Sequence, residues 1–388
     1  MLSVPASSPW SRYFSRSSFD LNYVIRGVLV RNWAKVYGSS EFEDSPNDDE
    51  DLSKIDYGSL TVEIPALGQS ELMIFNDLLS SDHRSPREEE CLFDLDYLVR
   101  QGNRMGPLQK SSVVKRLQRG DLPPSIRPVF WIIALGADVN YDQSSYGRII
   151  EKSHLISKEV ARQITLDVNR TSFSECPFSL TLYYKRSVFR VLVAFALLFP
   201  QIGYCQGLSY IVGYLTTVVV SEEVVFSLIC RICSVSLPPD YYTRSLKGVL
   251  VDQKVLNRLV SKFCKVEKIT VDVLGSTCVN WLMTLFCASL PLKALEVFFD
   301  YYVVFPEQST FRLALGIYKN SENSIDVRQQ VDQCISNMTG EGVHRILNDR
   351  VYSHVTTSYL TKRRARMRMK LEQSGGVLEE VSNLFGLT

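Results

Sequence analysis

The sequence predicts an all-α protein with a poorly ordered N-terminal region. From about residue 111 onward, apolar residues recur at three- and four-residue spacings, the period of a helix that buries one face. No alternating apolar and polar stretch bounded by hairpin turns stands out, so β-strands are not expected. The apolar fraction is 45%, which is ordinary for a globular protein, and 388 residues allow one large domain or two to three smaller ones.

The first 81 residues show little sign of a packed structure. A segment rich in serine and arginine comes first, and an acidic run from Glu41 to Asp51 follows without a hydrophobic period. Blocks of like charge repel one another and stay solvated. Pro5 and Pro9 interrupt the helix that a transit peptide requires. We therefore expect residues 1–81 to be a largely disordered tail. Apolar positions between Leu60 and Leu79 leave open a small strand or helix there.

Charge and cysteine usage narrow the functional class. The net charge is +1, so no global field attracts the chain to nucleic acid, and we expect no nucleic-acid partner. Nine scattered cysteines, an odd number, favour a reducing compartment, which indicates a cytoplasmic protein. Cys230 and Cys233 form a lone pair without further ligands at metal-binding spacing, so no metal site is expected. The apolar run 208–220 is too short to span a membrane, which takes roughly 18 residues.

The organised part begins with short helical segments. Val113, Val114 and Leu117 form one apolar helical face, and Gly120 follows where a helix can end. Two prolines at 123–124 then introduce a helix over 130–135, which ends at Gly136. Trp131 is expected in the core.

The first candidate functional stretch continues a helix predicted over 154–164. Ile164, Asp167 and Arg170 follow one another at steps of three, so they lie within one third of the helix circumference. The isoleucine can anchor the turn in the core, and the aspartate can orient the guanidinium at the exposed end. On spacing alone, Asp167 and Arg170 are equally well an ordinary surface ion pair that contributes about 0–1 kcal/mol.

The second stretch follows a buried helix over 180–199, which is interrupted at residues 200–203. Residues 204–207 then open the next helix, and this places Gln206 near its N-terminus after a tight turn. Gly203 and Gly207 allow another backbone to approach closely. The alternative is that Gln206 simply caps the helix.

The second half continues the helical pattern. Ser221 is suited to N-cap a helix with Glu222 and Glu223 in its first turn, and the prolines at 238–239 stop it. Further helices are predicted over 251–263, 279–290 and 292–302. The basic run from Lys362 to Lys370 predicts a solvated helix face. The alternative is that this run makes weak peripheral contact with an anionic membrane.

Two motifs in this order resemble the TBC domain family, the Rab GTPase-activating proteins. Ile164, Asp167 and Arg170 match its IxxDxxR motif, and Tyr204 and Gln206 match its YxQ motif. The resemblance covers residues 105–324 and is nearest to the growth-hormone-regulated TBC subgroup. It implies two helical subdomains that meet around residue 240, followed by a helical C-terminal extension over 325–388.

The resemblance also implies a function in vesicle trafficking. Arg170 and Gln206 are then the arginine and glutamine fingers that complete the active site of a Rab-type GTPase in its GTP form. The supporting residues would be Ile164, Asp167, Thr171, Tyr204 and Gly207. The chain needs no cofactor of its own, because GTP and magnesium are carried by the partner. A cytoplasmic protein that is peripheral on organelle membranes is expected.

Three alternatives stay open. A catalytically silent module with the same fold could bind a small GTPase or another partner as a trafficking scaffold. A structural or adaptor role could reside in the tails. A metal-dependent or nucleophilic enzyme is the least supported, because the four histidines show no ligand spacing and no serine sits in a nucleophile elbow.

Overall fold

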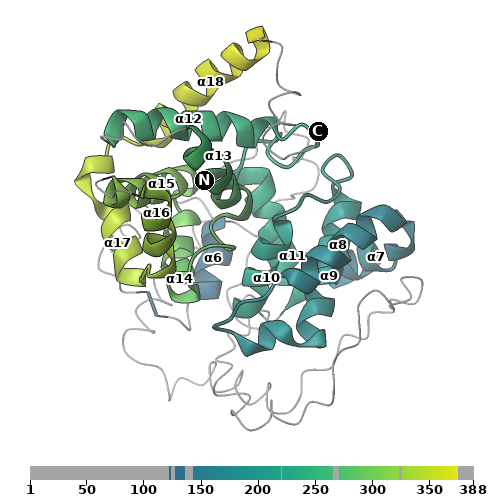
Figure 1. Cartoon of the computed structure of the whole chain (residues 1–388). Coiled ribbons are helices and arrows are strands. Elements are labelled where there is room, and N and C mark those ends of the chain that lie inside the picture. The colour runs from purple at the N-terminus through teal and green to yellow at the C-terminus, as the bar shows by residue number, and fades with distance from the viewer. Residues whose placement is uncertain are drawn as a thin grey trace. The chain divides into compact units, whose positions relative to one another are not determined.

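The structure is a computed structural model that describes residues 122–123, 127–135, 143–219, 221–264, 271–322 and 326–374. These residues form helices joined by turns, and none of the described elements is a β-strand, so the expected all-α class is confirmed (Figure 1). The predicted flexible tail and its acidic run lie outside the described residues. Among the described helices, none combines the length and apolar character of a membrane span.

The chain divides into two compact units. The first contains the described residues up to Tyr204 together with 212–232, and the second contains 205–211 and the described residues from Cys233 onward. The two-unit organisation agrees with the expectation from the sequence, although the chain passes into the second unit at Cys233 rather than near residue 240. The passage falls in a π-helical turn, Ile232–Ser236, which extends helix α11 and ends just before the two prolines.

The helices of the first unit include α9, against which α7, α8 and α11 pack. They are α6 (Arg127–Leu135), α7 (Gln143–Ile150), α8 (Lys158–Arg170), α9 (Leu182–Leu198), the C-terminal part of α10 (Leu208–Val218) and α11 (Glu222–Arg231). Trp131 is fully buried and lies 6.1 Å from the ring of Tyr214, as expected for a core residue. Buried aromatic pairs of this kind provide much of the apolar area that stabilises a helical core.

Polar residues set the ends of these helices. The side chains of Ser157, Thr181 and Ser221 accept hydrogen bonds from backbone N–H groups in the first turns of α8, α9 and α11. Each cap satisfies a donor that has no partner within the helix and contributes about 1 kcal/mol. The predicted N-cap at Ser221 is therefore confirmed.

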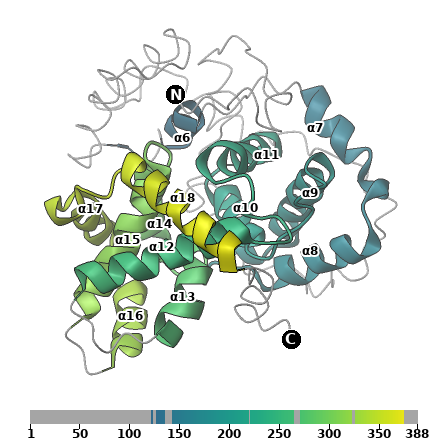
Figure 2. The same ribbon diagram turned by 90° about the horizontal axis from the view of Figure 1, so that it is seen from above.

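The second unit contains seven helices within the described part of the chain, besides the N-terminal end of α10. They are α12 (Lys247–Phe263), α13 (Val271–Thr284), α14 (Leu292–Tyr302), α15 (Pro306–Ser321), α16 (Val327–Ser336), α17 (Gly340–Asn348) and α18 (Thr357–Ser374). Within the unit, α12 packs against α13, α15 and α18, and α14 packs against α17 (Figure 2). The helix expected over 292–302 is observed with the same bounds, and α12 starts four residues before its expected beginning.

The helix expected over 279–290 is wrong in its second half. α13 ends at Thr284, and Leu285 and Phe286 adopt left-handed backbone angles, with φ of 48° and 64°. Such angles are costly for residues with a side chain. Here they turn Phe286 back onto Trp281, with ring centroids 5.5 Å apart, and both rings are almost completely buried. Burial of two large aromatic side chains outweighs the local preference.

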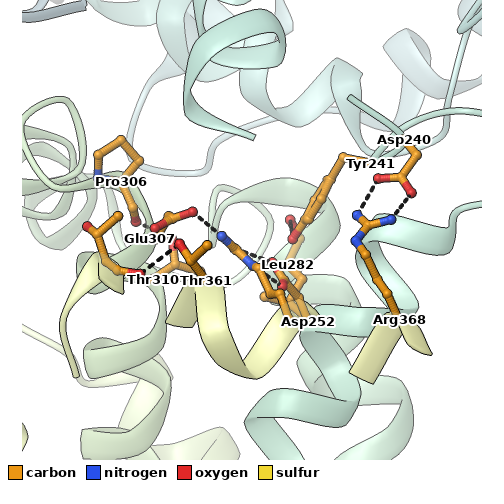
Figure 3. A network of polar contacts seen from close by, with 11 residues as sticks. Asp240, Tyr241, Asp252, Leu282, Pro306, Glu307, Thr310, Thr361 and Arg368 are labelled. Carbon is orange, nitrogen blue, oxygen red and sulfur yellow. Dashed lines mark hydrogen bonds and ion pairs between the residues drawn. The ribbon is translucent and has the colours of Figure 1, made fainter. Parts of the chain in front are cut away.

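The expectation of a solvated basic run is also wrong in part. Residues 362–370 are helical in α18, but Arg364 is buried and pairs with Asp252 of α12 and Glu307 of α15. Arg368 forms two hydrogen bonds with Asp240 (Figure 3). Two of the basic side chains thus attach α18 to the rest of its unit, because their partners come from segments that are distant in sequence.

Candidate functional site

The candidate site is built on the last turn of α8 in the first unit. Ile164 is fully buried and anchors this part of the helix, and Asp167 is buried one turn later. Arg170 is the last helical residue, and its side chain is 54% exposed. The helix therefore presents a guanidinium at its exposed end from a turn that the core holds in place.

Thr171 stops α8 directly after Arg170. It is completely buried, its hydroxyl donates to the carbonyl oxygen of Asp167 over 2.7 Å, and its N–H donates to that of Val168 over 3.1 Å. Gly213 of α10 faces this turn. A Cβ at Gly213 would lie 3.1 Å from Thr171 Cγ2 and 2.5 Å from the hydroxyl of Tyr184. The absence of a side chain at 213 thus allows close packing beneath the end of α8.

The carboxylate of Asp167 joins two other candidate residues. Its Oδ1 lies 2.5 Å from Nη2 of Arg170, and its Oδ2 accepts a hydrogen bond of 2.5 Å from the Tyr204 hydroxyl. Charge-assisted hydrogen bonds of this kind are shorter and stronger than those between neutral groups. Only 10% of the Asp167 side chain is exposed. The carboxylate consequently fixes one edge of the guanidinium, and no other described residue forms an ion pair with Arg170.

Gln206 lies in a tight turn two residues after Tyr204. Gly203 and Gly207 border the turn with φ of 61° and 104°, angles that favour glycine. The sequence-based expectation that residues 204–207 open the helix needs a small correction, because α10 begins at Leu208. Gln206 is exposed, and its side-chain amide forms no hydrogen bond within the described part of the chain. The alternative in which Gln206 caps a helix therefore has no support.

The turn has little room for a side chain at residue 207. A Cβ on Gly207 would lie 3.1 Å from the carbonyl oxygen of Met283, which belongs to the same unit. Together with the positive φ, this close approach explains why glycine occupies the position.

The first unit brings Asp167, Arg170 and Tyr204 into one network, with Ile164 and Thr171 buried behind it. Gln206 and Gly207 follow along the chain in a segment that belongs to the second unit. Leu166, which was not predicted from the sequence, has an apolar side chain that is 57% exposed and lies one helical turn before Arg170. The four-residue spacing to Arg170 is the signal that could have identified it.

The described residues offer little basis for other chemistry. Among them, no group of three or more His, Cys, Asp or Glu side chains is arranged to hold a metal ion. Cys230 and Cys233 are buried, and burial raises the pKa of the Cys233 thiol. A thiol kept protonated is a poor nucleophile and metal ligand, so Cys233 acts as a packing residue.

Comparison with known proteins identifies the family. Residues 124–325, slightly more than half of the chain, match the model of the Rab-GTPase-TBC domain. TBC1 domain family member 2A of Rattus norvegicus is 32% identical over 230 residues, which are 56% of this chain and 24% of that protein. The chain thus spans only about a quarter of the length of that relative.

Two further comparisons agree with the match to the Rab-GTPase-TBC domain model. Growth hormone-regulated TBC protein 1 of Xenopus tropicalis is 30% identical over 238 residues, 58% of this chain and 68% of that protein. The solved Chlamydomonas flagellar RabGAP TBC domain shares the fold, with a TM-score of 0.50 and 17% identity over 69% of this chain and 96% of that one. The chain belongs to the Rab-GTPase-TBC domain family.

Proposed function

We propose that this chain stimulates GTP hydrolysis by a Rab-type small GTPase, to which it lends Arg170 and Gln206. The partner in its GTP form carries the nucleotide and magnesium, and the chain contributes no cofactor. It is a GTPase activator that completes another protein's active site. Such a protein acts in vesicle trafficking, in the cytoplasm and on the surfaces of organelles.

The chemistry explains why an arginine and an amide suffice. Attack of water on the γ-phosphate spreads negative charge over the phosphoryl oxygens, and a guanidinium can stabilise that charge. Its planar array of donors suits phosphate better than a lysine ammonium does. An arginine finger accelerates hydrolysis about 10³–10⁵-fold. This acceleration corresponds to an activation free energy that is lower by roughly 4–7 kcal/mol. This effect far exceeds the roughly 0–1 kcal/mol of a surface ion pair.

The observation that carries the proposal is the double use of the Asp167 carboxylate. Oδ2 accepts from Tyr204, and Oδ1 pairs with a guanidinium that is more than half exposed. A stability role alone does not require Arg170 to extend into solvent. An arginine that must enter a second protein benefits from being oriented before docking, because less conformational entropy is lost on binding.

Gln206 is proposed to orient the attacking water. Its amide is exposed, forms no hydrogen bond among the described residues, and is presented by a turn with glycines on both sides. Only two peptide steps separate it from Tyr204, which is about 7 Å of chain at most. Tyr204, whose hydroxyl contacts Asp167, is thus a near neighbour of Gln206 along the chain.

The test is a panel of GTP-loaded Rab proteins, assayed for phosphate release with and without the full chain. At least one member should hydrolyse GTP faster when the chain is present. Arg170→Ala should lower the rate of catalysed hydrolysis about 10³–10⁵-fold. Arg170→Lys should fail as well, since it keeps the charge but loses the planar array of donors. Gln206→Ala should lower the rate without abolishing binding.

Arg162→Ala is the matched control, because Arg162 is an exposed arginine of the same helix, eight residues before Arg170. It should leave the rate unchanged. If Arg170→Ala stays within a few-fold of the unmodified chain, the proposed role of Arg170 is wrong. Stoichiometric binding without turnover across the panel would instead identify a catalytically silent TBC module.

A further inference from the structure

Helix α18 in the second unit uses its basic residues in two different ways. Arg364 turns inward, where Nε and Nη2 donate to the two carboxylate oxygens of Asp252 over 2.6 and 2.7 Å. Arg368 pairs with Asp240 (Figure 3). Lys247 Nζ lies 2.6 Å from Glu372. These contacts hold α18 antiparallel to α12, because higher residue numbers on one helix meet lower numbers on the other.

The remaining basic residues point away from this network. Lys362, Arg366 and Lys370 are exposed and follow one another at steps of four, so they share one face of α18. On the adjacent α12, Arg258 and Lys262 are exposed at the same spacing. None of these five side chains forms an ion pair or a hydrogen bond within the described residues. We call this set, together with Arg363, the cationic face.

A narrow hollow lies between the two helices at the centre of the cationic face. Arg258 and Lys262 line it from α12, and Arg363 and Arg366 line it from α18, above apolar side chains of both helices. Its volume is about 30 Å³, which is room for about two water molecules. No acidic residue lines it, and it is too small to enclose a nucleotide or a lipid headgroup.

The cationic face carries an excess of positive charge, although the chain as a whole is nearly neutral. Of the ten basic residues of α12 and α18, Lys247, Arg364 and Arg368 are paired with acidic side chains. The six residues of the cationic face form no ion pair within the described residues, although the whole chain has a net charge of only +1. Like charges on two packed helices repel one another, and salt screens the repulsion only in part over these short distances. An external array of negative charge would therefore be attracted to this face.

We propose that the cationic face docks the protein onto an anionic lipid bilayer. Its charges are spread over several turns of two helices and surround no enclosed pocket, which suits a plane of phosphates better than a single small anion. Met369 is 60% exposed beside Lys370 and is the only large exposed hydrophobic residue among those described in α12 and α18. One apolar side chain can enter the interface, but it is too little for the apolar core that a stable protein partner requires.

The test measures co-sedimentation of the full chain with vesicles of phosphatidylcholine alone and of phosphatidylcholine containing phosphatidylserine. The protein should bind only the anionic vesicles, and binding should weaken as salt is raised. Each basic residue near such a surface strengthens binding about fivefold. The triple variant Arg258→Gln, Lys262→Gln, Arg366→Gln should therefore bind roughly a hundredfold more weakly.

A triple variant of equal charge provides the matched control. Arg328→Gln, Arg345→Gln and Arg350→Gln neutralise three exposed arginines of the same unit outside α12 and α18. This control should retain binding to anionic vesicles. Thermal unfolding of both triple variants should show no loss of stability, since all six side chains are exposed.

Several outcomes would overturn the proposal. They are equal binding to neutral and anionic vesicles, no vesicle binding at all, and equal loss in the two triple variants. Tighter binding to soluble polyglutamate than to anionic vesicles at the same salt would assign the face to an acidic protein instead. The proposal does not depend on GTPase activation, and phosphate release in solution should be the same for both triple variants.

Discussion

The hydroxyl of Tyr204 donates a hydrogen bond of 2.5 Å to the buried carboxylate of Asp167. The two residues lie 37 positions apart in the sequence, and Asp167 in turn pairs with Arg170. The first motif thus receives structural support from the second. Tyr204 and Asp167 are proposed as positioning residues, which act on the reaction through the orientation of Arg170.

Removal of the Tyr204 hydroxyl should lower kcat more than it raises KM. A hydrogen bond to a charged group contributes about 1.5–3 kcal/mol, so Tyr204→Phe should slow catalysed GTP hydrolysis roughly ten- to a hundredfold. Tyr210→Phe is the control, since Tyr210 is partly exposed and its hydroxyl has no hydrogen bond among the described residues. Equal rates for Tyr204→Phe and the unmodified chain would show that the contact does not position Arg170.

The effects of mutating Asp167 and Tyr204 on catalysis should be coupled, because the two side chains are hydrogen-bonded to each other. Asp167→Asn keeps an acceptor for Tyr204 but removes the charge that pairs with Arg170, so kcat should fall less than in Arg170→Ala. The double variant Asp167→Asn, Tyr204→Phe should lose less than the sum of the two single losses, by about 0.5–3 kcal/mol. A double-mutant cycle of kcat values measures this coupling. Strict additivity would mean that the two residues act independently.

Leu166 should contribute to docking of the GTPase. It is 57% exposed and lies one turn before Arg170, so it can contact the surface that surrounds the nucleotide. Leu166→Ser should raise KM several-fold, with little change in kcat and in the midpoint of urea unfolding. Leu155→Ser, at a residue that is 65% exposed and precedes α8, is the matched control. If the two variants behave alike, Leu166 has no special role.

Loss of Arg364 should destabilise the second unit strongly. Burial alone would lower the pKa of Arg364, but Asp252 and Glu307 raise it, so the side chain stays charged. Arg364→Met would leave the buried Asp252 and the half-buried Glu307 without their main partner. Breaking a buried ion pair in this way costs about 3–5 kcal/mol, and removal of the opposite partner restores part of the loss.

Urea unfolding should therefore rank Arg364→Met as the least stable variant, with partial recovery in Arg364→Met, Asp252→Leu. Arg366→Met is the control, because Arg366 is exposed and has no ion pair among the described residues. A loss below about 1 kcal/mol for Arg364→Met would mean that the buried network does not hold α18 in place.

The ion pair between Asp240 and Arg368 should depend on pH. Burial alone would raise the pKa of Asp240, but the hydrogen bonds and the charge of Arg368 outweigh burial and lower it. The stability that the pair contributes is therefore present above the unfolded-state pKa of about 3.9. It is lost as the pH falls through the lower pKa of the folded state.

Asp240→Asn should consequently cost about 1 kcal/mol at neutral pH, and the difference from the unmodified chain should shrink below about pH 4. Urea unfolding of Asp240→Asn and of the unmodified chain, at several pH values from neutral to acidic, measures this difference in the free energy of unfolding. Asp332→Asn, at an exposed aspartate of α16 without a side-chain ion pair among the described residues, is the control. A difference that persists unchanged in acid would contradict this origin of the stability.

The helical class and several helix bounds could be predicted because their signals are local. The apolar period, the N-cap at Ser221 and the prolines after α11 each act within one or two helical turns. The left-handed turn at Leu285 and Phe286 could not be predicted in this way. It depends on packing of Phe286 against Trp281, which outweighs the local preference for a helix.

The sequence by itself determined an all-helical protein of the TBC family and singled out Arg170 and Gln206, because period and motif spacing are written in neighbouring residues. Only the tertiary structure decided that Asp167 bridges Arg170 and Tyr204, and that Arg364 is buried against Asp252, which lies 112 positions away. It also decided which basic residues of α18 remain exposed. The physical reason is that hydrogen bonds and ion pairs between distant segments depend on how the helices pack, and no local pattern encodes that packing.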